Sequence, residues 1–219
     1  MWKGKYSEKL VNNKIQELPE EYVIFNDLLF ESNGYSTQID HIVVSPYGVF
    51  VIETKGYKGW ILGGENSEYW TQTIYKSKHQ FYNPIKQNAG HVRFLRHLLR
   101  CSVDIPFIPI VVFNNDAELK VHIVNSLVVN RYSLKRTILQ HRTSVLNQET
   151  TDWIVRTINQ NRIIADKEKL KQHKHNAKAR QYRSSDLINQ GICPQCGGQL
   201  LLRHGTVSYT HLTLPTIRL

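Results

Sequence analysis

Asp40, Glu53 and Lys55 are the residues of this chain whose types and spacing could do chemistry. Two β-rich apolar runs surround Ser45-Pro46-Tyr47-Gly48, a combination that is typical of a hairpin. If Ser45 pairs with Gly48, counting outward places Asp40 opposite Glu53, with Cβ atoms ~5 Å apart on one sheet face. Lys55 shares that face, because side chains alternate along a strand.

Two carboxylates directly opposite each other repel unless a positive charge neutralises them. Mg²⁺ (or Mn²⁺) meets this need, since Mg²⁺ is commonly held by one or two carboxylates together with waters and substrate phosphate. Beside such an ion, Lys55 would orient or deprotonate a water, or stabilise charge on a phosphate under attack. The plainer alternative is a salt-bridged Lys55 with two solvated acids at the strand ends. The matching register favours the metal site.

The sequence around these residues resembles the nuclease-related domain (NERD), a branch of the PD-(D/E)xK nuclease superfamily that is proposed to act in DNA processing. The resemblance is carried by GKYSEKLVNNKIQELPEEY, STQIDHIVVSPYGVFVIETKGYKGWILG and FYNPIKQNAGHV. It is strong over residues 3–113 and weaker as far as residue 161. It implies that the domain spans 1–161 and has the restriction-endonuclease-like core of that superfamily.

The resemblance also implies roles for individual side chains. Asp40 and Glu53 would bind the metal, and Lys55 would assist the attacking water. Glu8, on the helix before the sheet, would complete the metal site, and Gln87, on a later helix, would position water or backbone. By spacing alone, Glu8 is as well explained as an exposed carboxylate near a helix N-terminus. His91 lies one turn after Gln87, so both could face the acidic end of the sheet, although a lone histidine is more simply a structural residue.

Periodicity predicts one α/β (α+β) domain, a mixed sheet flanked by helices. Asn83-Pro84 reads as a helix start, with Asn as the cap. The hairpin strands are apolar on both faces, which indicates a central position in the sheet. The other expected elements are a helix over 5–18, strands over 22–30, 69–75, 105–113 and 121–130, a glycine-rich turn region over 56–64, and closing helices over 134–139 and 153–159.

Aromatic and basic residues alternate after Lys55, in a pattern that can grip a phosphate backbone and stack bases. The rings are Tyr57, Trp60, Tyr69, Trp70, Tyr75, Phe81 and Tyr82, with Lys58, Lys76 and Lys78 among them. Packing in the core or at its rim is the simpler explanation for most of these rings.

The net charge of +10 is concentrated near the C-terminus. Residues 161–219 hold ten of the 28 Lys and Arg residues but three of the 18 Asp and Glu residues. Such a basic flank, read as a helical linker over 162–190, suits DNA as a partner, or is simply a solvated helix. The chain has three cysteines, no secretory signal and no apolar run long enough to cross a bilayer. These features predict a cytoplasmic protein without a membrane segment.

Cys193 and Cys196 form one half of a zinc ribbon, similar to the ribbons appended to type I topoisomerases. Structural zinc needs four ligands, normally from a second CxxC roughly 15–20 residues further on, and this chain has none. His204 and His211 could formally complete a Cys₂His₂ ligand set, but we do not expect them to do so. We therefore read 191–205 as an incomplete ribbon, and 206–219, which contains VSYTHL, as a non-native and poorly ordered tail.

The sequence favours a metal-dependent nuclease that hydrolyses DNA phosphodiester bonds in DNA processing or repair. A first alternative is a non-catalytic nucleic-acid-binding protein on a nuclease scaffold, with the basic flank and the ribbon as its active parts. A second is a metal-dependent hydrolase of another phosphate substrate.

The incomplete ribbon leads to a prediction about zinc. The purified chain should bind Zn²⁺ weakly or not at all, because two thiolates leave the tetrahedral shell half filled. Metal analysis of protein purified without chelator tests this. One tightly held zinc ion per chain would contradict it.

Overall fold

The structure is a computed structural model that describes residues 2–32, 35–100, 104–163, 200–202 and 209–211. Contacts divide the chain into two units, Met1–Ile164 and Ala165–Leu219, each described here by itself. In the second unit, β10 (Leu200–Leu202) pairs antiparallel with β11 (Tyr209–His211). Cys193, Cys196, His204 and most of the predicted linker, ribbon half and tail lie outside the described residues, so the predictions for them stay predictions.

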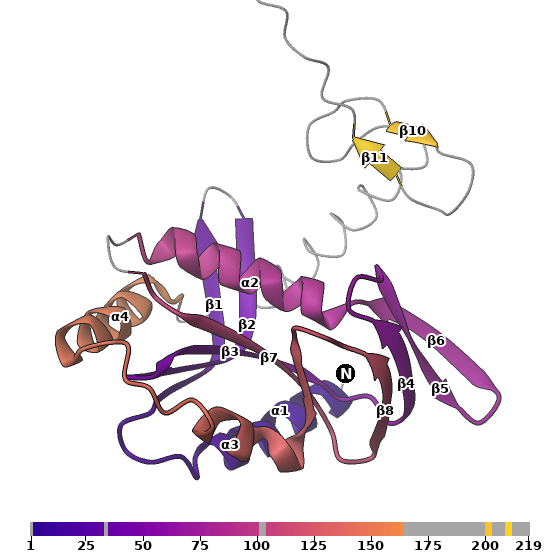
Figure 1. Cartoon of the computed structure of the whole chain (residues 1–219), viewed down its shortest axis with the longest axis horizontal. Helices are drawn as coiled ribbons and strands as arrows, with labels where there is room; N and C mark the ends of the chain where they lie inside the picture. Colours follow the sequence, from indigo (N-terminus) through magenta and orange to yellow (C-terminus); the bar gives the residue numbers. More distant parts are fainter. Residues whose placement is uncertain (1, 33–34, 101–103, 164–199, 203–208, 212–219) are drawn as a thin grey trace, which may run out of the picture. The chain divides into compact units, whose positions relative to one another are not determined.

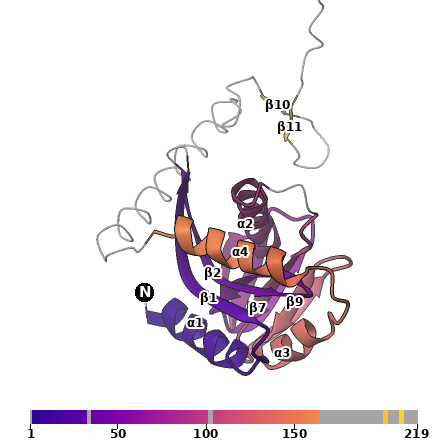
Figure 2. The same ribbon diagram turned by 90° about the vertical axis from the view of Figure 1, so that its left-hand side faces the viewer.

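The first unit is built on a five-stranded mixed sheet with helices on both faces (Figures 1 and 2). Its strand order is β1 (Val23–Ser32), β2 (Tyr35–Ser45), β3 (Gly48–Lys55), β7 (Phe107–Phe113) and β9 (Leu127–Asn130). The β1–β2–β3 pairs are antiparallel, and the β3–β7–β9 pairs are parallel. The predicted fold class, a mixed sheet flanked by helices, is confirmed.

Two apolar clusters pack the helices onto the sheet. One joins Ile42 and Val51 to Leu95 of α2 (Pro84–Leu98) and Ile154 of α4 (Gln148–Asn161). The other joins Val43 and Ile52 of the opposite sheet face to Val11 of α1 (Trp2–Ile15) and Leu134 of α3 (Arg131–Leu139). Because the hairpin strands are covered on both faces, their apolar residues show no clean alternation. Their predicted central position is confirmed.

The register of the β2–β3 hairpin is the one that the sequence predicted. The printed pairs run from Ser45↔Gly48 through Ile42↔Val51 to His41↔Ile52. The next pair in this register is Asp40 with Glu53. The turn residues and the apolar runs thus place both acids at the same end of the sheet.

A second, four-stranded sheet has the order β6 (Ser77–Tyr82), β5 (Tyr69–Ile74), β4 (Gly59–Gly64) and β8 (Ala117–His122). The prediction of turns over 56–64 was wrong for 59–64, which form β4. A Cβ on Gly63 would lie 2.4 Å from the ring of Trp70, which is fully buried. Here glycine makes room for a core aromatic ring rather than marking a turn.

Several boundaries also differ from the expectation. Helix α1 runs over Trp2–Ile15 rather than 5–18, and the expected single strand over 121–130 is divided between β8 and β9. Strand β7 lies inside the sheet, between β3 and β9, although it contains Pro109. Pro109 precedes Ile110, the first residue paired with β9, so β7 is still unpaired on that side at Pro109.

Helix α2 is fixed at its first turn by the fully buried Asn83. Its Oδ1 accepts a hydrogen bond from the Ile85 N–H at 2.9 Å, which confirms the predicted cap. Its Nδ2 donates to the carbonyls of Glu65 at 2.9 Å and Ser67 at 2.6 Å. Further along α2, Asn88 Nδ2 donates to Val51 O at 2.8 Å and Ile110 O at 3.2 Å. These amides set how α2 lies on the sheet.

We predict that Asn83→Ala lowers the free energy of unfolding by about 2–4 kcal/mol, because it removes a cap and leaves buried carbonyls without donors. Chemical denaturation tests this. The matched change is Asn147→Ala at the cap of α4, which accepts one bond, from the Thr150 N–H, and is exposed. It should cost about 1 kcal/mol. Equal losses in the two variants would contradict the clamping role of Asn83.

Candidate active site

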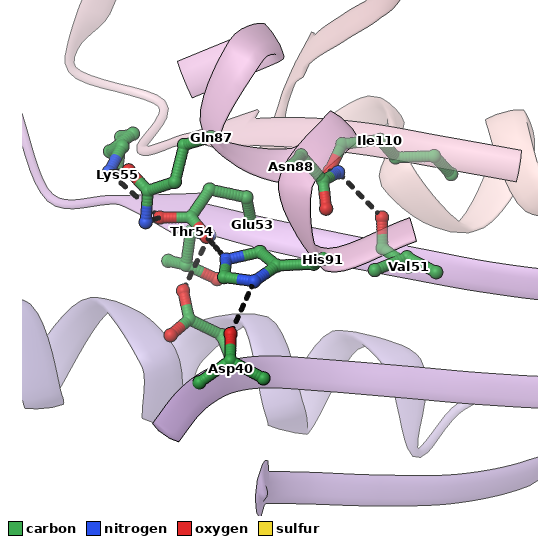
Figure 3. A network of polar contacts seen from close by, with 10 residues as sticks. Asp40, Val51, Glu53, Thr54, Lys55, Gln87, Asn88, His91 and Ile110 are labelled. Carbon is green, nitrogen blue, oxygen red and sulfur yellow. Dashed lines mark hydrogen bonds and ion pairs between the residues drawn. The ribbon is translucent and has the colours of Figure 1, made fainter. Parts of the chain in front are cut away.

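The carboxylate of Glu53, at the end of β3, is buried, with 4% of the side chain exposed. Its Oε1 accepts hydrogen bonds from Lys55 Nζ and from Gln87 Nε2, both at 2.8 Å (Figure 3). Its Oε2 lies 3.2 Å from His91 Nε2. Charge-assisted bonds of this kind are what allow an ionised carboxylate to stay out of water.

Gln87 and His91 connect this carboxylate to α2 and β2. Gln87 also accepts a hydrogen bond from Lys55 Nζ at 2.8 Å through its Oε1, so its amide bridges the acid and the amine. Because an ionised carboxylate only accepts hydrogen bonds, the His91–Glu53 bond requires a proton on Nε2. His91 Nδ1 lies 3.1 Å from Thr37 Oγ1, which fixes the plane of the ring.

Asp40 lies at the corresponding end of β2. Its Oδ2 accepts a hydrogen bond from the Thr54 N–H at 2.8 Å, and it therefore continues the β2–β3 connection beyond His41↔Ile52 (Figure 3). The neighbouring His41 is buried, and its Nδ1 lies 2.7 Å from Asn26 Oδ1. Burial lowers the pKa of His41 to about 4, so this ring is neutral near pH 7 and adds no positive charge beside the acids.

The three central charges influence one another strongly. Burial, followed by the charge of Glu53, raises the pKa of Asp40 well above its usual range; Glu8 adds to this, and the Thr54 N–H partly opposes it. Burial also acts to raise the pKa of Glu53, but the Lys55 charge and His91 outweigh it, so the pKa is lowered. For Lys55, burial is outweighed by the Glu53 charge, so its pKa is raised.

These pKa shifts indicate which of the three groups are charged. Glu53 is ionised, Lys55 is an ammonium, and Asp40 is the acid that takes up a proton most readily. The Lys55 ammonium thus lies near both Asp40 and Glu53 but pairs with Glu53. Carboxylate oxygens are the ligands that Mg²⁺ and Mn²⁺ prefer. The residues present therefore fit a hard divalent cation.

Glu8 lies on α1, close enough for its charge to raise the pKa of Asp40. Ser7 beside it is buried and accepts a hydrogen bond from Asn114 Nδ2 at 2.9 Å, so the second turn of α1 is tied to the residue that follows β7. Helix α1 thus brings the predicted helix glutamate towards the sheet's acidic end.

Within the described residues, no group of three or more His, Cys, Asp or Glu side chains is placed to hold a metal ion. In this structure Glu53 turns towards Lys55 and Gln87. The metal-binding roles of Asp40, Glu53 and Glu8 stay predictions.

Of the predicted site residues, the structure joins Glu53, Lys55 and Gln87 by hydrogen bonds and places Asp40 at the neighbouring strand end. The sequence allowed His91 to face the acidic end of the sheet but favoured a structural role, and it did not predict the contact with Glu53. The signal for this contact was the one-turn spacing from Gln87, which puts both residues on the same side of α2. The bond from Thr37 had no recognisable signal.

A cavity of about 600 Å³ opens beside Lys55. Residues from α1, β3, the segment after it, β5 and the loop after β7 line it: Gly4, Tyr6, Ser7, Lys55, Gly56, Tyr57, Lys58, Gln72, Ile74, Asn114 and Asp116. The buried acid–amine pair therefore has access to solvent on the Lys55 side.

The mixed sheet with its acid–lysine pair at a strand end defines an α+β protein with a nuclease-like core. A family model, the nuclease-related domain, matches residues 3–114, and the chain belongs to that family. The chain is also 36% identical over 177 residues to the uncharacterized protein pXO1-01 of Bacillus anthracis, a match that covers 78% of this chain and 82% of that protein. No solved structure gives a significant match. No helix within the described ranges is long and apolar enough to cross a membrane.

The raised pKa of Asp40 leads to a prediction about stability. Above the usual pKa of an aspartate, folded Asp40 retains a proton that the unfolded chain has lost, so stability falls as pH rises through that window. In EDTA at pH 8, Asp40→Asn should therefore melt on the order of a few degrees higher than wild type. The asparagine Oδ1 still accepts the Thr54 bond.

Thermal melts from pH 4 to 8 test this prediction, and the gain should shrink towards pH 4. Asp152→Asn, at an exposed carboxylate on α4, serves as the matched change and should show no such trend. An Asp40→Asn variant that is less stable than wild type at pH 8 would contradict the burial of excess charge.

Proposed function

We propose that this protein is a metal-dependent nuclease of the PD-(D/E)xK type that hydrolyses DNA phosphodiester bonds. The observation that supports this most is the buried Glu53 carboxylate, bonded to Lys55 at 2.8 Å, with Asp40 at the adjacent strand end. An ion pair with no task in binding or catalysis is seldom kept out of water, because desolvation offsets most of its attraction. Membership of the nuclease-related domain family supports the same reaction class.

Asp40 and Glu53, with Glu8 directly or through water, would hold Mg²⁺ or Mn²⁺. A cation bound there supplies Lewis-acid stabilisation of a phosphate and lowers the pKa of a water. Lys55, whose pKa is raised, acts as a positive charge and hydrogen-bond donor rather than as a base in the resting site. It would orient the water or neutralise charge on the phosphate.

Gln87 and His91 act through Glu53 and Lys55. Gln87 holds the two groups at fixed positions through its amide, and His91 fixes the second carboxylate oxygen. Both side chains come from α2, so the docking of that helix sets the geometry of the acid. In this proposal they are positioning residues.

The test is cleavage of supercoiled plasmid in Mg²⁺ or Mn²⁺ by wild type and by Asp40→Ala, Glu53→Gln and Lys55→Met. Each variant should lose at least about 10²–10³-fold in rate, because each removes a charge that acts on the transition state. EDTA should abolish wild-type cleavage. Circular dichroism shows whether the variants stay folded.

Lys14→Met provides the matched control for Lys55→Met, since Lys14 forms an exposed ion pair with Glu17 at 2.9 Å. It should cut at the wild-type rate. Wild-type cleavage by folded Glu53→Gln or Lys55→Met would contradict the assigned roles. Wild-type protein that binds plasmid but leaves it uncut in either metal would favour the non-catalytic binding protein.

A further inference from the structure

Tyr75 combines a fully exposed ring with a strained backbone. It is 99% exposed, at the tip of the β5–β6 hairpin (Figure 1), where Ile74 pairs with Ser77 and leaves Tyr75-Lys76 as the turn. Its φ of 52° lies in the left-handed region. Glycine or asparagine adopts this backbone with less strain than a bulky aromatic residue. A strained backbone that displays a solvated ring points to a function for the ring.

A cavity of about 420 Å³ lies beside this ring. Its lining includes Tyr75, Trp60, Thr73 and Lys58. Trp60 is 49% exposed, and Lys120 Nζ lies 3.7 Å from the centre of its ring. That cation–π contact holds the indole in one orientation. The cavity is thus lined by two aromatic residues that are accessible to solvent.

This cavity adjoins the one that reaches Lys55, since Lys58, Ile74 and Asp116 line both of them. A ligand seated beside Trp60 and Tyr75 would therefore lie next to the cavity of the candidate active site, with Lys58 between the two. The charged residues of the two linings are one acid, Asp116, and two lysines, Lys55 and Lys58.

We propose that Trp60 and Tyr75 form a base-stacking subsite for single-stranded DNA, which extends the substrate path from the candidate active site. Bases stack on aromatic rings regardless of sequence, while lysines attract the phosphates between them. Lys58 in the shared wall and Lys76 beside Tyr75 supply those charges. The proposal rests on the proposed nuclease function for its substrate class, and it names the form of DNA that the enzyme holds.

The test measures binding of a fluorescent oligothymidylate of about 12 nucleotides by anisotropy, in EDTA so that nothing is cut. Tyr75→Asn and Trp60→Ala should each weaken binding about 10-fold, as the loss of one base–ring stack does. Tyr75→Phe should bind as wild type, because it keeps the ring. All three should bind a blunt duplex as wild type does.

Thermal melting separates this role from a structural one. Tyr75→Asn should melt at or above the wild-type temperature, since asparagine suits a positive φ. Tyr132→Ala removes a ring on α3 that is 81% exposed and lines neither cavity, and it should leave binding unchanged. Weak binding by Tyr75→Asn together with undiminished stability would support the subsite.

Several results would overturn the subsite: wild type that does not bind the single strand, variants that bind it normally, or equal losses for single strand and duplex. Self-association that Tyr75→Asn abolishes, with single-strand binding unchanged, would assign the ring to a protein contact instead. Wild type that binds the single strand but does not cut plasmid would contradict only the proposed nuclease function. Cutting by wild type with normal binding by Tyr75→Asn would contradict only the subsite.

Discussion

The buried carboxylate of Glu53 must be stabilised by hydrogen-bond donors from the elements around it. An unpaired charge in this environment costs several kcal/mol, and three donors from two elements offset that cost. Lys55 comes from the same strand, and Gln87 and His91 come from α2. Asp40 lies close by, and its pKa is raised because burial and the Glu53 charge outweigh the Thr54 N–H and the Lys55 charge that oppose them. A divalent cation would supply further positive charge beside Asp40 and Glu53.

The placement of α2 on the sheet brings two of these donors to Glu53. Asn83 fixes the start of the helix against the β4–β5 loop, and Asn88 ties its middle to the backbone of β3 and β7. Gln87 and His91 flank Asn88, so the contacts that hold the helix also aim the two side chains at Glu53. Glycine at position 63 contributes at a distance, because it admits the Trp70 ring and lets the second sheet pack beside β7.

The sequence predicted the parts of the site that depend on local rules. The turn at Ser45-Pro46-Tyr47-Gly48 and the apolar runs fixed the hairpin register, and Asn83-Pro84 marked the start of α2. Contacts set by packing between distant elements were not predictable in this way. His91 gave no sign of which acid it would meet, and Gly63 reads as a turn until the Trp70 ring is placed against it. Such contacts depend on helix docking, which a single sequence does not encode locally.

The central claim is that Asp40 and Glu53 share a divalent cation. A crystal of the protein soaked in Mn²⁺, with anomalous scattering measured at the manganese edge, tests it most directly. The account predicts an anomalous peak in contact with oxygens of both acids, with Glu53 turned partly away from its present donors. A fully soaked crystal without a peak there, and with Glu53 still bonded to Lys55, Gln87 and His91, would contradict it.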